Sequence, residues 1–261
     1  MSDYSRDEMM TAAAARRLWN GCVCFVGIGL PSAACNLARL THAPDIVLIY
    51  ESGTIGTRPN LLPLSIGDGE LAETAACVVP LPEVFSYLLQ AGRVDVGFLG
   101  AAQIDRFGNL NSTVIGPYDK PRTRLPGAGG APEIASHAQQ TFVVMRASPR
   151  SFVEKIDFCT SAGFMTGGDA RAKTSAHGKG PQAVIADFGV LTPASGSNEL
   201  TLTALFPNAS VEDARKAVGW TLRVADTLET LAAPTAEELS VLRALNARTE
   251  AAHSRPVDLP A

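Results

Sequence analysis

Residues 45–50, with the sequence DIVLIY, are apolar at every position after the first. A strand with one solvent-facing side alternates polar and apolar residues, so this uninterrupted run predicts a strand that is buried on both faces. Strands of that kind lie inside parallel sheets, where helices cover both faces. The segment therefore favours an α/β fold built on an open parallel sheet.

The segments around this strand follow a β-α-β order with short connections. Ser5 and Glu8 have the spacing of a capping box, which predicts a helix along the alanine-rich stretch 9–19 that Asn20-Gly21 ends. Pro31 suits the first turn of a second helix that runs to Leu40. We therefore expect an α/β fold with an open, mainly parallel sheet flanked by helices. Further strands are expected at 22–26, 94–99, 141–145 and 182–186, and further helices at 82–90, after Ser210 and after Thr235.

Two glycine- and proline-rich stretches, residues 100–132 and 161–181, exceed the usual length of a connection. Loops of that length are usually functional or mobile. The pattern contains no internal repeat, and we expect one domain over 1–261 with a frayed tail at 253–261.

Charge and cysteine content exclude several classes of function. The net charge of -4 and the sequence pI near 5.6 leave no basic surface for nucleic acid. No apolar run approaches the roughly 20 residues of a membrane span, and the acidic N-terminal segment is unlike a signal peptide, so we expect a cytoplasmic protein. The cysteines are odd in number and contain no CxxC pair, which indicates reduced, mostly buried thiols rather than a metal site: Cys22, Cys24, Cys35, Cys77 and Cys159.

Glu51 follows the buried strand directly and precedes Ser52 and Gly53. Ligands of open α/β sheets bind beyond the carboxyl ends of strands, and the loop GIGLP at 27–31 leaves the sheet at the same edge. The two loops are therefore expected to face one crevice. Glutamate is also common at strand ends without any catalytic role.

The loop at 27–31 permits a second hypothesis, a dinucleotide-binding fingerprint with Glu51 on the ribose. Gly27 and Gly29 fit that pattern, but Ser32 occupies its third glycine position and Pro31 lies where amides would face a pyrophosphate. A second glycine cluster, GAGGAP at 127–132, has the flexibility that allows backbone amides close to a reacting atom. Such a cluster also occurs in simple turns.

Five blocks of sequence follow one another along nearly the whole chain: GIGLP at 27–31, YESG at 50–53, SIGDGE at 65–70, FLGAAQIDRFGNLNSTVIG at 98–116 and LPGAGGAPEIA at 125–135. Taken together and in this order, they resemble the B subunits of family I coenzyme A (CoA) transferases. They are similar to the subunits that act on 3-oxoadipate more than to those that act on glutaconate.

This resemblance implies a covalent role for Glu51, which stands at the glutamate of the ESG motif. The B subunits of steroid-ring hydrolases with the same fold lack that glutamate. The resemblance also implies a set of backbone groups that bind CoA or the reaction's oxyanion: Gly27, Gly29, Ser52, Gly53, Gly129, Gly130 and Ala131.

The implied reaction moves CoA from succinyl-CoA to 3-oxoadipate, with a glutaconate-type or other dicarboxylate acceptor as the alternative. It implies a separate A subunit as partner, no metal and no organic cofactor, because CoA thioester is a substrate. Arg122 and Arg124 lie between the fourth and fifth blocks, and a loop arginine can bind a substrate carboxylate or a CoA phosphate or remain solvated.

Overall fold

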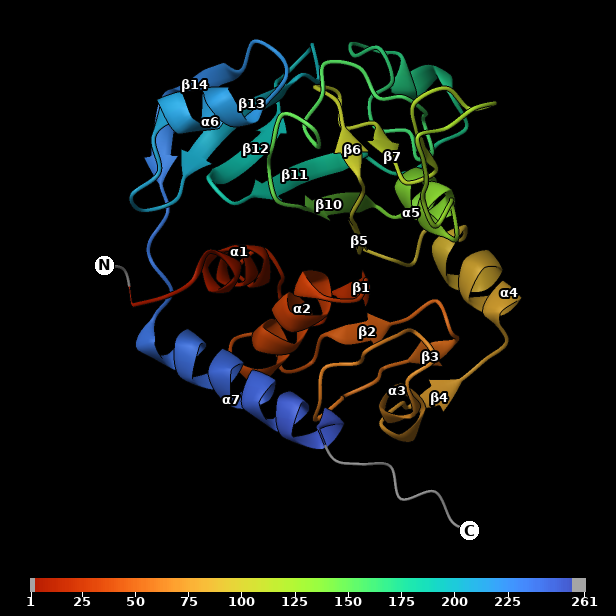
Figure 1. Ribbon diagram of the computed structural model, residues 1–261. Helices are drawn as coiled ribbons and strands as arrows, with labels where there is room; N and C mark the ends of the chain where they lie inside the picture. Colours follow the sequence, from red (N-terminus) through yellow and green to blue (C-terminus); the bar gives the residue numbers. More distant parts are fainter. Residues whose placement is uncertain (1–2, 255–261) are drawn as a thin grey trace.

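The computed structural model describes residues 3–254, and its centre is one ten-stranded sheet with the order β14-β13-β12-β11-β10-β5-β1-β2-β3-β4 (Figure 1). The five central strands β11, β10, β5, β1 and β2 are parallel to one another. The expected open, mainly parallel sheet flanked by helices is therefore confirmed. The five strands span Pro181–Ala186, Gln140–Val144, Val96–Leu99, Val23–Phe25 and Val47–Ile49.

Antiparallel strands extend the sheet at both ends. Beyond β2, the short strands β3 (Thr54–Ile55) and β4 (Cys77–Val78) pair antiparallel. Beyond β11, β12 (Gly189–Pro193) and β13 (Leu200–Leu205) also pair antiparallel, and β14 (Arg223–Thr230) runs parallel to β13. The sequence pattern did not predict these outer strands.

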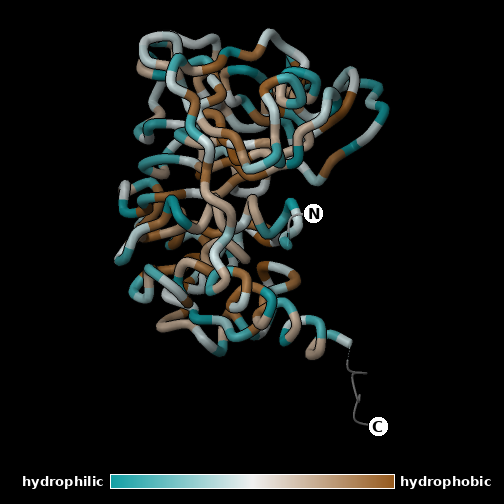
Figure 2. Tube along the Cα trace, turned by 90° about the vertical axis from the view of Figure 1, so that its left-hand side faces the viewer, coloured by the Kyte–Doolittle hydropathy of each residue, from teal (hydrophilic) through white to brown (hydrophobic). Residues whose placement is uncertain are grey.

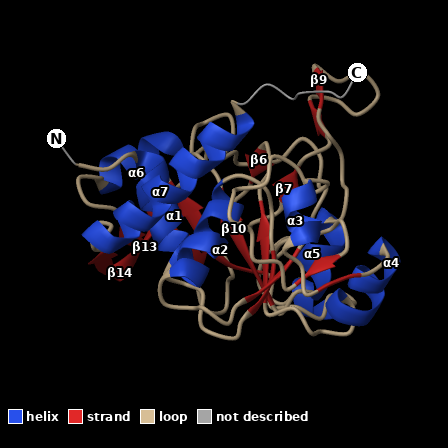
Figure 3. Cartoon of the chain, turned by 90° about the horizontal axis from the view of Figure 1, so that it is seen from below, coloured by secondary structure: helices blue, strands red, loops and turns tan. Residues whose placement is uncertain are grey.

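Helices cover the two faces of the sheet unequally. One face is covered by α1 (Arg6–Ala15), α2 (Leu30–Leu40) and α7 (Ala236–His253), which pack on each other. The other face carries α5 (Ala131–His137) and the π-helix η1 (Val84–Leu89). Figure 3 shows the two groups of helices on opposite sides of the central strands. The remaining helices are α3 (Gly69–Glu73), α4 (Leu81–Glu83), α6 (Val211–Ala217) and the 3-10 helix η2 (Arg171–Lys173).

Alternate residues of the central strands point into two separate cores. In β2, Leu48 belongs to the core under α1 and α2, whereas Ile49 belongs to the core under α5. Both are buried, which explains why the run 45–50 has no polar position after its first residue. Figure 2 shows hydrophobic stretches gathered inside and hydrophilic ones on the outer turns.

Capping residues set several helix boundaries as the sequence predicts. Ser5 and Glu8 form a complete capping box on α1, and Thr235 and Glu238 form another on α7. The first helix nevertheless ends at Ala15, before the expected stop, because the next turn tightens into bonds from Arg17 to Ala14 and from Leu18 to Ala15.

The two long stretches are more ordered than a loop prediction implies. The first contains two small hairpins, and the second contains η2 between turns. The hairpins pair β6 (Gln103–Ile104) with β7 (Leu110–Asn111) and β8 (Val114–Ile115) with β9 (Thr123–Arg124). Two-residue strands are too short to give a period in the sequence.

Other expectations are met in part. Three cysteines, Cys22, Cys24 and Cys35, are buried thiols, whereas Cys77 and Cys159 are exposed. Within residues 3–254, no helix combines the length and apolar character required to cross a membrane. Of the tail expected to fray, 255–261 lie outside the described residues.

Candidate active site

Glu51 lies in a tight turn between the parallel strand β2 and the antiparallel strand β3. The Gly53 amide donates to the Tyr50 carbonyl at 3.0 Å, and the Tyr50 amide donates to the Thr54 carbonyl at 3.1 Å. Gly53 has φ +102°, and a Cβ there would overlap the Val79 carbonyl. Only glycine fits this position, so the ESG turn holds the backbone of Glu51 in place.

The alternation of the strand directs Glu51 toward the face that carries α5. Tyr50 is fully buried in the opposite core, where its hydroxyl lies 2.9 Å from the Ser32 hydroxyl. Burial raises the pKa of Tyr50, so its hydroxyl stays neutral at ordinary pH. Glu51, the next residue, lies beside Gly129 and Gly130.

The second glycine cluster reaches the Glu51 carboxylate, as the resemblance implies. A Cβ built on Gly130 would lie 3.0 Å from Glu51 Oε1, and one on Gly129 would lie 3.7 Å from it. Gly130 itself has φ -83°, which any residue tolerates. The position needs glycine because the carboxylate and a neighbouring ring occupy the space of a side chain.

The amides of this loop differ in availability. The Ala131 amide donates to the Ala128 carbonyl at 3.1 Å. The amides of Gly129 and Gly130 have no acceptor among the described residues. Of the three residues of this loop in the implied set, Gly129 and Gly130 therefore keep an unbonded amide, and Ala131 uses its donor within the turn.

The Glu51 carboxylate is half-buried and has no hydrogen bond or ion pair with any residue of the described chain. Structural carboxylates at strand ends usually satisfy nearby amides or pair with cations. The neighbouring Ser52 hydroxyl is buried and also has no partner among residues 3–254. The carboxylate therefore remains available to a ligand or a partner surface, whereas the chain itself already encloses the Ser52 hydroxyl.

Phe85 is a component of the site that the sequence pattern did not indicate. Its Cζ would lie 2.5 Å from a Cβ on Gly130, and its ring centroid lies 5.7 Å from that of Phe25. The ring forms an apolar wall beside the carboxylate. It projects from η1, where we expected an ordinary helix, and π-helical turns are frequent at functional sites.

The loop at 27–31 divides between two environments. Gly27 comes two residues after Phe25, which pairs with Ile49, and a Cβ built on Gly27 would lie 3.8 Å from the Phe98 carbonyl oxygen of β5. Gly29, with φ +83°, caps α2 and lines a cavity of about 710 Å³ together with Leu62 and Leu242. Glu51 does not line that cavity.

Some groups of this loop that the dinucleotide-binding hypothesis would need are already hydrogen-bonded within the protein. The Ser32 hydroxyl binds Tyr50, and the Ala33 amide donates to the Gly29 carbonyl at 3.0 Å. Glu51 lies against Gly129 and Gly130 on the side of α5, whereas α2 covers the other face. The arrangement favours a site built from the ESG turn and the second glycine cluster.

Arg122 and Arg124 are both exposed on the β8–β9 hairpin, which projects from the body of the protein (Figure 3). The Arg124 guanidinium lies 4.9 Å from the Tyr118 ring centroid. Arg122 lines a cavity of about 490 Å³ with Lys155. Neither arginine forms an ion pair within the described chain.

The block DRFGN within 98–116 is structural. The Asn109 side chain, 5% exposed, donates to Asp105 Oδ2 and the Met165 carbonyl and accepts from the amides of Gly163 and Met165. Burial raises the pKa of Asp105, and hydrogen bonds from Asn109 and the Phe107 amide oppose that rise. This block ties the first long stretch to the second.

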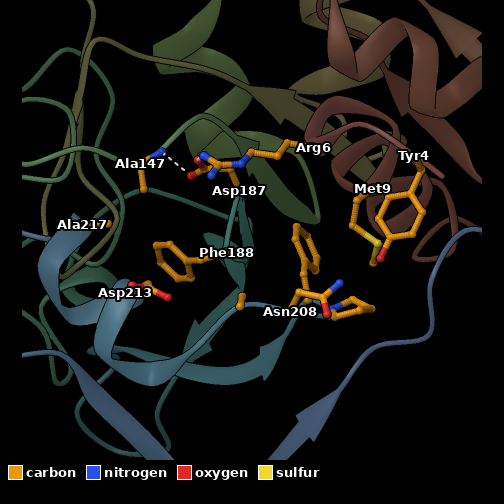
Figure 4. A pocket seen from close by; sticks show the side chains of 12 residues that line it. Tyr4, Arg6, Met9, Ala147, Asp187, Phe188, Asn208, Asp213 and Ala217 are labelled. Atoms are coloured by element: carbon orange, nitrogen blue, oxygen red, sulfur yellow. Dashed lines mark hydrogen bonds and ion pairs between the residues drawn. The ribbon is translucent and has the colours of Figure 1, made fainter. Parts of the chain in front are cut away.

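A separate cavity of about 400 Å³ lies elsewhere along the sheet, next to the end of β11 (Figure 4). Asp187, which follows β11, accepts from the Ala147 amide at 2.9 Å and from Arg6 at 3.3 Å. Three strands separate β11 from β2, so this cavity is not part of the Glu51 site. Among residues 3–254, no group of three or more histidine, cysteine or carboxylate side chains is placed to hold a metal.

The chain is similar to known proteins over nearly its whole length. The chain is 60% identical to the B subunit of 3-oxoadipate CoA-transferase from Pseudomonas knackmussii over 98% of each chain. The crystal structure of glutaconate coenzyme A-transferase from Acidaminococcus fermentans has a TM-score of 0.86 and 34% identity, covering 92% of this chain and 94% of that one.

The same fold occurs in an enzyme with a different activity. The crystal structure of the decarboxylase AibA/AibB has a TM-score of 0.79 and 27% identity, covering 94% of this chain and 96% of that one. Residues 7–217 match the sequence pattern of the family described as coenzyme A transferase. Because that match spans most of the sheet and both glycine loops, the chain belongs to the coenzyme A transferase family.

Proposed function

We propose that this chain is the B subunit of an enzyme that transfers CoA from succinyl-CoA to 3-oxoadipate, with Glu51 as the covalent carrier. The observation that carries this proposal is an unpaired carboxylate beside Gly129 and Gly130, whose backbone amides have no acceptor among residues 3–254. The choice of substrates rests on the likeness to a protein named for 3-oxoadipate CoA transfer.

The chemistry proceeds through two covalent forms of Glu51. The carboxylate attacks the thioester carbonyl of succinyl-CoA, and CoA leaves as the thiolate from a succinyl-glutamyl anhydride. The thiolate then attacks the glutamyl carbonyl, which gives a glutamyl-CoA thioester and releases succinate. The acceptor acid reverses these steps and leaves as its CoA ester. Because the carboxylate is the carrier, none of these steps requires a metal or an organic cofactor.

The free amides of Gly129 and Gly130 stabilise the oxyanion that forms in each addition step. One preorganised donor of this kind contributes about 2.7–4 kcal/mol to a barrier. A glutamate carboxylate is ionised at neutral pH, so the attack on the thioester needs no general base. The geometry of the turn supplies orientation as well, because the backbone of Glu51 is fixed on both sides.

An A subunit completes the enzyme in this proposal. The relative from Pseudomonas knackmussii is named as a B subunit, which implies a second kind of subunit in that protein. In the present chain, the Glu51 carboxylate and the buried Ser52 hydroxyl lack partners within residues 3–254. We expect the partner and the bound CoA ester to cover the carboxylate, and we expect the isolated chain to be inactive.

The decisive experiment is to trap the covalent intermediate. The complex with the A subunit is incubated with succinyl-CoA, and the peptides are mapped by mass spectrometry. We expect the mass of CoA on Glu51 in the absence of acceptor. Modification of a different residue during turnover contradicts the mechanism.

Substitution of the carboxylate provides the quantitative test. We expect Glu51→Gln to lower kcat by more than about 10³-fold, because the amide cannot form the anhydride. Glu133→Gln, in α5 near its start, removes a carboxylate that lies close to the same loop in sequence and serves as the matched control. An equal loss of kcat in both variants would sink the assignment of Glu51.

The acceptor is tested separately from the mechanism. We expect kcat/KM for 3-oxoadipate to exceed that for glutaconate or acetoacetate, with succinyl-CoA as donor. A preference of tenfold or more for glutaconate, about 1.4 kcal/mol of transition-state discrimination, replaces 3-oxoadipate by the glutaconate-type alternative. The covalent role of Glu51 survives that outcome.

A further inference from the structure

Arg171 is a buried arginine in the second long stretch, far along the sequence from the residues of the site. It is 6% exposed, and its guanidinium group donates to four backbone carbonyls. The acceptors and distances are Gly178 at 2.9 Å from Nε, Ala162 at 3.2 Å and Gly163 at 3.0 Å from Nη1, and Ala135 at 2.7 Å from Nη2.

This arginine has no carboxylate partner within the described residues. Removing a cation from water without a counter-charge costs free energy, and burial accordingly lowers the pKa of Arg171. The guanidinium group remains protonated in proteins, and its fixed fork suits several acceptors at once. The buried guanidinium group therefore holds four backbone carbonyls in fixed positions relative to one another.

One of those points belongs to α5. The Ala135 carbonyl lies near the end of this helix, and the segment carrying Arg171 meets the same end through two backbone bonds. The Gly178 amide donates to the Ser136 carbonyl at 2.9 Å, and the Lys179 amide donates to the Gln139 carbonyl at 2.8 Å. The second long stretch thus forms a brace behind α5.

The opposite end of α5 adjoins Gly129 and Gly130, which lie beside Glu51. Gly130 immediately precedes the helix, and its carbonyl accepts from the Ile134 amide at 3.0 Å. Ala135 lies five positions after Gly130, a distance of about 7.5 Å along a helix axis. A helix this short moves as a unit, so a shift at Ala135 displaces Gly129 and Gly130 as well.

We propose that Arg171 is a positioning residue, which sets the distance between the Glu51 carboxylate and the amides of Gly129 and Gly130 by holding α5 from behind. The inference rests on the function proposed above for Glu51 and the glycine amides. Arg171 touches neither of them. Its effect reaches the reaction through Ala135 and the helix.

Arg16 offers a matched control on the opposite face of the sheet. It also joins two segments through backbone carbonyls, donating to Ala232 at 2.7 Å and Ala233 at 2.8 Å, and it pairs with Glu238. These bonds connect the end of α1 to the start of α7. A purely structural arginine in this fold is therefore available for comparison.

The experiment measures kcat and KM for succinyl-CoA in the complex carrying Arg171→Ala, Arg171→Lys or Arg16→Ala, at equal fractions of folded protein. We expect Arg171→Ala to lower kcat by at least about tenfold with KM within about twofold, since misplacement by about 1 Å costs up to 10²-fold. Arg16→Ala is expected to lower the melting temperature and leave kcat unchanged. Arg171→Lys keeps the charge without the fork, and we expect an intermediate kcat.

Added guanidinium ion provides a readout that a general loss of stability does not produce. The Arg171 side chain lines a cavity of about 410 Å³, which gives the small cation a route to the vacated position. We expect millimolar guanidinium to restore part of kcat in Arg171→Ala only. Where Arg171→Ala fails to fold, the kcat of Arg171→Lys decides the question.

The outcomes separate this inference from the proposed function. Wild-type complex that never carries CoA on Glu51 contradicts the proposed function. Wild-type complex that does so, together with an Arg171→Ala variant that forms the same thioester equally fast, overturns the positioning role alone. Equal kcat losses in the Arg171 and Arg16 variants also overturn it.

Discussion

The two long glycine-rich stretches have similar compositions and opposite roles. Residues 100–132 fold into two hairpins and then deliver Gly129 and Gly130 to Glu51. Residues 161–181 form turns behind α5, where Arg171 and Gly178 bind its final residues. Composition alone predicted the same behaviour for both. The difference lies in where their hydrogen bonds end: one stretch leaves two amides free, and the other binds the carbonyls of a neighbouring helix.

The strongest test of this contrast is Gly130→Ala in the first stretch. The new methyl group would lie 3.0 Å from Glu51 Oε1 and 2.5 Å from Phe85 Cζ, so the carboxylate, the ring or the loop has to shift. We expect kcat to fall by about 10³-fold, as when an oxyanion donor is removed, because the retained amide is displaced, and we expect a stability cost of about 1–3 kcal/mol. Steady-state kinetics and thermal unfolding of the complex measure the two effects.

Gly168→Ala in the second stretch is the matched control for that variant. Gly168 has φ +56°, and nothing lies within 4 Å of a Cβ built there. We expect a strain of about 1–2 kcal/mol and an unchanged kcat. A large loss of kcat in this variant would remove the distinction between the two stretches.

A smaller effect is expected where the stretches meet, at Asn109. Asn109→Ala leaves the amides of Gly163 and Met165 without their buried acceptor. We expect a loss of about 2–3 kcal/mol in the free energy of unfolding, measured by urea denaturation.

Asn246→Ala on α7 serves as its control, because that side chain has no hydrogen-bond partner among residues 3–254. A surface-type change of this kind usually alters stability by no more than about 0.5 kcal/mol. If the two asparagine variants are equally stable, the Asn109 network does not hold the stretches together.

Much of the central fold is predictable because its signals are local. The run 45–50 is apolar on both faces, and its strand, β2, is indeed buried in two cores. Capping boxes at Ser5 and Thr235 predict helices that form. Some missing predictions concern elements without such signals, such as the two-residue strands β3 and β4 and the π-helical turn at Phe85. The longer outer strands β12, β13 and β14 were also not predicted, although the sequence LTLTAL of β13 alternates as a strand does.

The site divides in the same way. Glu51, Gly129 and Gly130 were predicted together and lie together, because a strand end and a glycine loop are both visible in the sequence. Phe85 and Arg171 were not predicted, since their positions depend on packing between distant segments. The availability of an amide is likewise a tertiary property, and only the structure shows that Ala131 bonds to Ala128.

The alternation of β2 has a consequence for how activities diverge within this fold. Leu48 and Tyr50 are buried in one core and Ile49 in the other. The alternation of the strand therefore fixes the direction of the side chain at position 51, whichever residue stands there. Inserting or deleting one residue in the strand would reverse that direction. Replacing the side chain at position 51 leaves its direction unchanged. The chemical group at this point can therefore differ between proteins that share the fold. The crystal structure of a decarboxylase shares this fold, with a TM-score of 0.79.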